Sequence, residues 1–83
     1  MVTIYSIKQC GYCIELKVML DEANIIFIEK DLSIPENQKE FKKILEKTNI
    51  DALPTILVDK KIIAPSISFK TINEAFNIIK TLN

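Results

Sequence analysis

The chain has 83 residues, of which 48% are hydrophobic, and eleven lysines balance eleven acidic residues to give a formal net charge of zero. It has no histidine, which excludes Cys–His hydrolases and His-ligated zinc, and its two cysteines are too few for a tetrahedral structural zinc site. Arginine is absent and the lysines are interspersed with acids, so no basic patch indicates nucleic-acid binding.

The length and hydropathy predict the overall organisation. A single domain spanning residues 1–83 is expected, because domains commonly have about 50 to 250 residues. No apolar run approaches the roughly 18 residues of a membrane span, and the first residues lack a long apolar segment before a small-residue cleavage site. We therefore expect a soluble, monomeric, cytoplasmic protein with neither a membrane nor a nucleic-acid partner. In that compartment a lasting disulfide is unusual and a catalytic one is expected.

The first two predicted elements flank a pair of cysteines. Residues 2–7 are rich in β-branched side chains and predict a strand. Residues 11–23 predict a helix, because apolar side chains recur there at intervals of three and four residues. Cys10 then lies in the strand–helix turn and Cys13 in the first helical turn, where free N–H groups and the helix dipole favour a thiolate. Such a pair predicts a redox site, since one thiolate attacks a disulfide and the second thiol releases it.

The middle of the chain predicts a second strand and a second helix. Residues 24–31 form another β-branched run, so that strand–helix–strand predicts a parallel pair with a right-handed crossover. Ser33 and Glu36 have the spacing of a capping box and predict the start of the next helix. Its buried side is expected to carry Phe41, Ile44 and Leu45.

The last third of the chain predicts a hairpin and a final helix. Residues 55–58 form a short apolar strand, and residues 59–61 turn it into residues 62–63, without the usual glycine. The last helix is expected to begin near Thr71 with Glu74 at the capping-box position, and its inward side chains are Ile72, Ala75, Phe76, Ile79 and Leu82. The order βαβαββα predicts an α/β fold, with a four-stranded mixed sheet flanked by helices on both faces.

The cysteine motif and the element order together resemble the glutaredoxin branch of the thioredoxin fold, over nearly the whole chain. Residues 10–13 (Cys-Gly-Tyr-Cys) resemble the Cys-Pro-Tyr-Cys of dithiol glutaredoxins, with glycine in place of proline. Residues 53–55 (Leu-Pro-Thr) are similar to that family's Val-Pro-[Thr/Gln] segment before the third strand. The resemblance implies a cis peptide bond before Pro54, opposite the cysteines, and pairing of the Leu53 backbone with a bound thiol substrate.

The resemblance also implies a function. The protein would be a thiol–disulfide oxidoreductase with Cys10 as nucleophile and Cys13 as resolving thiol. It would reduce protein disulfides or glutathione mixed disulfides, with glutathione as co-substrate and without a tightly bound cofactor or metal. The implied substrate and glutathione contacts are Lys8, Tyr12, Leu53, Pro54, Ser66 and Ile67.

Two departures from the family pattern concern glutathione. Ile7 stands where glutaredoxins usually have a Lys or Arg that contacts the glycine carboxylate of glutathione, and Lys8, one residue closer to the cysteines, either substitutes for it or is solvated. Residues 64–67 (Ala-Pro-Ser-Ile) replace the Gly-Gly-[Cys/Ser/Thr]-Asp stretch that binds the γ-glutamyl end.

These departures leave two alternatives open. A flavoprotein reductase in place of glutathione would make the chain a small thioredoxin or a donor redoxin, for example a hydrogen donor to ribonucleotide reductase. In a different class, Cys10 thiolates of two chains, with glutathione, would hold a [2Fe–2S] cluster. A brown colour after anaerobic purification would distinguish that carrier.

Overall fold

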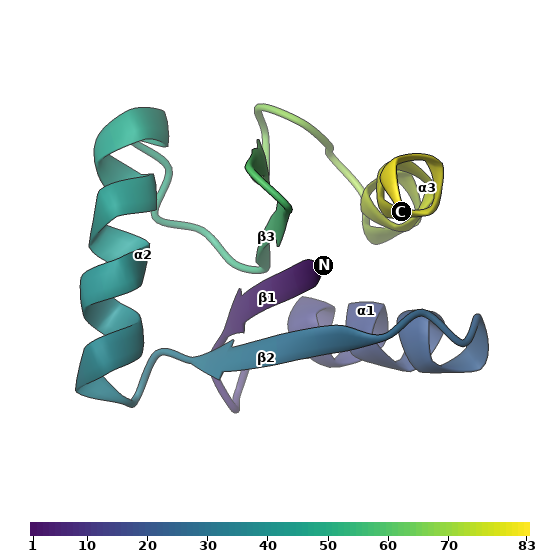
Figure 1. The fold of residues 1–83 in the computed structure, drawn as a ribbon, viewed down its shortest axis with the longest axis horizontal. Coiled ribbons are helices and arrows are strands. Elements are labelled where there is room, and N and C mark those ends of the chain that lie inside the picture. The colour runs from purple at the N-terminus through teal and green to yellow at the C-terminus, as the bar shows by residue number, and fades with distance from the viewer.

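The computed structural model describes residues 1–83, in which four strands form one mixed sheet of order β2-β1-β3-β4 (Figure 1). β1 (Val2–Ser6) pairs in parallel with β2 (Phe27–Asp31) and antiparallel with β3 (Thr55–Val58). β4 (Lys61–Ile63) pairs antiparallel with β3 and forms the second edge of the sheet. The mixed four-stranded sheet predicted from the sequence is thereby confirmed.

Three helices cover the two faces of this sheet. In Figure 1, α2 (Pro35–Thr48) lies on one side, and α1 (Gly11–Glu22) and α3 (Ile72–Leu82) lie on the other, where they contact each other. No helix is both long enough and apolar enough to cross a membrane.

The side chains of β1 alternate between two apolar clusters, as the two-residue period of a strand requires. Tyr5 belongs to the smaller cluster under α2, with Phe41 and Ile44. The larger cluster fills the space between the sheet, α1 and α3, and consists of Val2, Ile4, Leu16, Leu20, Ile56, Val58, Ile63, Phe69, Ile72, Ala75 and Ile79. Of the inward positions predicted for the two later helices, Phe41, Ile44, Ile72, Ala75 and Ile79 are buried. Phe76 and Leu82 are half-buried and pack against the larger cluster, whereas Leu45 is half-buried and belongs to neither cluster.

Two polar residues adopt the left-handed conformation. One lies before β2 and shortens this strand relative to the prediction, and the other lies in the turn between β3 and β4. Asn24 has φ 58° and follows Ala23, the C-cap of α1, so β2 begins at Phe27 and not at residue 24. Asp59 has φ 54° in the hairpin between β3 and β4, the position where glycine is usual. Asn and Asp tolerate this region better than most side chains, which explains a hairpin without glycine.

The capping box predicted at Ser33 and Glu36 is wrong. α2 has Ile34 as its N-cap, without a side-chain cap, and Pro35 occupies the first helical turn. Proline is favoured there because its missing N–H would have no partner within the helix. The backbone N–H of Ser33 instead donates to Asp31 Oδ1 at 2.8 Å, which makes Ser33 part of the turn after β2.

The capping box predicted at the last helix is confirmed. Thr71 is the N-cap of α3, and its Oγ1 accepts a hydrogen bond from the Glu74 N–H at 3.2 Å. The Glu74 carboxylate accepts in return from the Thr71 N–H at 3.0 Å. This reciprocal pair defines where the β4–α3 connection ends.

Candidate active site

Cys10 is the N-cap residue of α1. Its backbone is extended, with φ −89° and ψ 105°, and its Sγ accepts a hydrogen bond from the Cys13 N–H at 3.1 Å. An N-cap side chain normally offers an oxygen to these unpaired N–H groups, and here a sulfur takes that place. The free N–H groups and the positive end of the helix dipole favour negative charge at this position.

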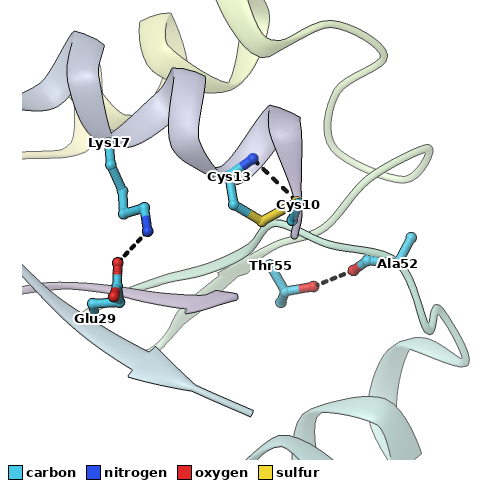
Figure 2. The surroundings of a disulfide bond; sticks show 6 residues. All are labelled: Cys10, Cys13, Lys17, Glu29, Ala52 and Thr55. Atoms are coloured by element: carbon cyan, nitrogen blue, oxygen red, sulfur yellow. Dashed lines mark hydrogen bonds and ion pairs between the residues drawn. A yellow bond between two sulfur atoms is a disulfide. The ribbon is translucent and has the colours of Figure 1, made fainter. Parts of the chain in front are cut away.

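The two cysteines form a disulfide, with their Cα atoms 5.2 Å apart (Figure 2). This separation lies within the usual range for disulfides. Cys13 is completely buried, whereas Cys10 is partly exposed. Only the sulfur of Cys10 is therefore accessible to a molecule that approaches from solvent.

The nearest cation on α1 is already paired. Lys17, one turn beyond Cys13, forms an ion pair with Glu29 of β2, as Figure 2 shows. The pair links α1 to the edge strand of the sheet. Within α1, the helix terminus is therefore the remaining group that favours negative charge at Cys10.

The segment before β3 lies beside the disulfide. The Leu53–Pro54 peptide bond is cis, as expected from the sequence, and Pro54 is buried. On either side of this dipeptide, the Thr55 hydroxyl donates to the Ala52 carbonyl at 2.9 Å, and Figure 2 draws both residues in the surroundings of the cysteines. This hydrogen bond holds the turn that presents Leu53 and Pro54.

A cleft of about 630 Å³ reaches the cysteine motif at Tyr12, whereas neither Cys10 nor Cys13 lines it. Its walls come from the first turn of α1, the turn before β3, the β4–α3 connection and the start of α3. Four of the side chains predicted to contact the substrate line it together, namely Tyr12, Leu53, Pro54 and Ser66. Tyr12 is 67% exposed and is the residue of the cysteine motif that lines this cleft.

Two of the predicted contacts lie outside the cleft lining. Ile67 is 60% exposed and does not line the cleft. Lys8 is also exposed, and its positive charge helps to lower the pKa of Asp31 at the end of β2. Hydrogen bonding from Ser33 is the main cause that lowers the pKa of the Asp31 carboxyl, and the charges of Lys8 and Lys17 contribute further.

Lys70 and Glu15 also line the cleft, although the sequence analysis did not identify them. Glu15 follows the cysteine motif on α1, where it looks like an ordinary surface acid. Lys70 directly precedes the Thr71 capping box, and its backbone N–H donates to Glu74 Oε1 at 2.9 Å. Hydrogen bonds from the Lys70 and Thr71 N–H groups lower the pKa of Glu74. The position of Lys70 directly before a predicted helix start was the one sequence feature that could have identified it as a candidate binding residue.

Comparison with known proteins identifies relatives of this chain. A family model described as Glutaredoxin matches residues 2–63. Two curated proteins named Glutaredoxin 1, from Rickettsia felis and Rickettsia prowazekii, are each 31% identical over 58 residues, which is 70% of this chain. The match spans 57% and 61% of those two relatives, which is less than two thirds of their length.

Solved structures of similar fold cover nearly the whole chain. The holo form of a glutaredoxin from Populus tremula x tremuloides has a TM-score of 0.70 at 16% identity, over 96% of this chain and 74% of that one. A buckwheat glutaredoxin–glutathione complex has a TM-score of 0.72 at 16% identity, over 96% and 68%. A thioredoxin-like protein has a TM-score of 0.68 at 19% identity, and the match covers 100% of both chains. The predicted thioredoxin-like fold is confirmed.

Proposed function

The chain belongs to the glutaredoxin family, and we propose that it is a thiol–disulfide oxidoreductase acting through Cys10 and Cys13. One observation carries this proposal: a partly exposed cysteine at a helix N-cap forms a disulfide with a fully buried cysteine three residues later. The difference in exposure supports the proposed roles. Cys10 meets the substrate and Cys13 resolves the mixed disulfide.

The reductive half of the cycle consists of two thiol–disulfide exchanges. The Cys10 thiolate attacks one sulfur of the substrate disulfide, so that a Cys10–substrate bond forms, the substrate S–S bond breaks and the first thiol leaves. The Cys13 thiolate then attacks Cys10 Sγ, which forms the Cys10–Cys13 disulfide and releases the second substrate thiol. Two electrons pass from the protein dithiol to the substrate.

Glutathione is the proposed reductant that restores the dithiol. One glutathione thiolate attacks Cys10 Sγ and frees Cys13, and a second attacks the resulting mixed disulfide to give glutathione disulfide and the Cys10 thiol. Tyr12, Leu53, Pro54 and Ser66 support this assignment, since they line one cleft beside the cysteines. A backbone contact at Leu53 requires no particular side chain. The substrates are then protein disulfides and glutathione mixed disulfides.

A flavoprotein reductase is the second candidate for the reductant. The lack of charged side chains at positions 7 and 67 favours it. Ile7, at the place of the usual cation, is 42% exposed and apolar, and Ile67 is exposed outside the cleft. The absence of both charged contacts weakens glutathione binding, because charge-assisted hydrogen bonds are about twice as strong as neutral ones.

Side-by-side turnover of one protein disulfide tests both reductants. The first assay supplies glutathione with glutathione reductase, and the second supplies thioredoxin reductase, each with NADPH. Faster turnover with glutathione supports the first assignment, and faster turnover with thioredoxin reductase replaces it with the second. If dithiothreitol-reduced protein fails to reduce any disulfide, the proposed oxidoreductase function is wrong.

A further inference from the structure

The cleft beside the redox pair contains a lysine without an acidic partner. Lys70 is its only cationic side chain. The three ion pairs of the protein involve Met1 with Asp59, Lys17 with Glu29, and Lys30 with Glu40, so Lys70 takes part in none of them. Lys70 is also exposed. Its charge helps to lower the pKa of Glu74 but forms no ion pair, so the ammonium group can still pair with a bound molecule.

The start of α3 holds Lys70 in place through its backbone. One carboxylate oxygen of Glu74 accepts hydrogen bonds from the N–H groups of both Lys70 and Thr71, at 2.9 and 3.0 Å. The nearest acid on the same element is thus occupied by main-chain donors. The Lys70 backbone is fixed at the edge of the cleft, while its ammonium group forms no ion pair with Glu74.

The opposite charge comes from α1. Glu15 lines the same cleft and follows the cysteine motif by two residues. Neither Glu15 nor Lys70 forms an ion pair within the protein, so the cleft has a positive group on its α3 wall and a negative group on its α1 wall. A substrate that enters the cleft therefore experiences an electrostatic preference for one orientation.

The cysteine motif and Lys70 meet at one cleft, because Tyr12 and Lys70 both line it. Pro54 also lines this cleft. Because an extended chain advances about 3.3 Å per residue, we expect side chains next to a cysteine joined to Cys10 to enter it beside Tyr12. Pro65, Phe69 and Ile72 provide apolar surface for the same segment. We propose that Lys70 is a specificity-determining residue that favours protein disulfides in which an acidic residue flanks the reacting cysteine. This proposal rests on the oxidoreductase function proposed above.

Single-turnover reduction of matched peptides tests the proposal without involving any reductant. Two peptides differ only at the residue next to their cysteine, which is Asp in one and Lys in the other, and each carries mercaptoethanol in a mixed disulfide. The fully reduced protein is mixed with each peptide, and the second-order rate constant is measured by acid quench and mass spectrometry. Oxidised glutathione serves as a third substrate.

The wild-type protein should reduce the Asp peptide roughly three to five times faster than the Lys peptide at low salt, the scale of one partly exposed ion pair. The preference should shrink at 0.5 M salt, where screening is strong. Lys70→Gln should remove most of it, and Lys70→Glu should reverse it. Glu15→Gln should increase the rate for the Asp peptide by a smaller factor.

Lys43→Glu is the matched control, because Lys43 is exposed on α2, on the other side of the sheet. It changes the net charge by the same amount as Lys70→Glu and should leave the preference for the Asp peptide intact. Equal rates for both peptides in the wild-type protein would overturn the proposal, as would an equal shift in Lys43→Glu. If Lys70→Gln lowered the rate constant for oxidised glutathione as much as that for the Asp peptide, the proposal would also be overturned, because Lys70 would then act on glutathione. Failure to reduce any of the three substrates would instead refute the oxidoreductase function.

Discussion

Two parts of the active-site region differ in how closely they follow the glutaredoxin pattern. The cysteine end, defined as residues 7–13 together with residues 52–55, contains the redox motif and the buried cis-proline. The β4–α3 segment, defined as residues 64–74, has no glycine pair and no aspartate, but contributes a lysine to the cleft. The comparison separates chemistry from selection. In the proposed reaction, thiol–disulfide exchange depends on main-chain N–H groups and two sulfurs, whereas the choice of partner depends on the side chains that line the cleft.

Removal of the nucleophile should have the largest effect. Cys10→Ser is expected to abolish disulfide reduction, because Cys13 is completely buried and cannot replace it. Cys13→Ser should instead accumulate a mixed disulfide at Cys10, since the resolving thiol is missing. Mass spectrometry of each variant after incubation with a disulfide peptide measures both outcomes. Faster alkylation of Cys13 than of Cys10 in the reduced wild-type protein would contradict the assignment.

Loss of the α3 cap should affect stability and selectivity but spare the chemistry. Thr71→Ala removes the hydroxyl that accepts from the Glu74 N–H, which should cost about 0.5–2 kcal/mol of unfolding free energy. The resulting decrease in Tm is several degrees for a domain of this size. The preference for the Asp peptide should fall as well, because Lys70 is held by the same capping box.

Thr81→Ala is the control for this variant, because Thr81 lies exposed in the last turn of the same helix and bonds only the Asn77 carbonyl. Its Tm should remain close to that of the wild-type protein. If Thr71→Ala left both Tm and selectivity unchanged, the capping box would not be what positions Lys70.

A cation returned to the cysteine end should improve the use of glutathione. Ile7→Lys introduces a charge three residues before Cys10, at a side chain that is already 42% exposed, so the fold should tolerate it. An exposed carboxylate contact should lower the KM for glutathione by about two- to fivefold at low salt. Ile26→Lys adds the same charge at an 80% exposed site next to β2 and should leave KM unchanged. An unchanged KM in Ile7→Lys would favour the flavoprotein reductase.

The smallest expected effect is a change in stability at acid pH. The hydrogen bonds from Lys70 and Thr71 lower the pKa of Glu74 below its usual value of 4.5, so the folded state favours the carboxylate. This contribution is fully present above pH 4.5 and is lost as the pH falls through the lowered pKa. Glu74→Gln keeps a capping-box side chain that does not titrate. Its Tm should therefore decrease less between pH 5 and pH 3 than that of the wild-type protein, and an equal decrease would contradict this role.

The features predictable from sequence were those encoded over three or four residues. The Thr71–Glu74 box and the placement of Cys10 at the start of α1 depend only on neighbouring residues, and both agree with the structure. The box predicted at Ser33 failed although it has the same spacing. There the Asp31 side chain takes the Ser33 N–H, and Pro35 begins the helix two residues later. Local patterns decide a helix start only where no neighbouring side chain offers a better partner.

The sequence by itself determined the cysteine pair at a helix start, the order of the elements and most of the buried helix positions, because short motifs and apolar periodicity encode these features directly. Only the tertiary structure decided which charged side chains line the cleft together with Tyr12 of the cysteine motif. Tyr12 and Lys70 are 58 positions apart, and they line one cleft because α1 and α3 pack on the same face of the sheet. That packing is driven by the common apolar core, which carries no information about the charges at its edge.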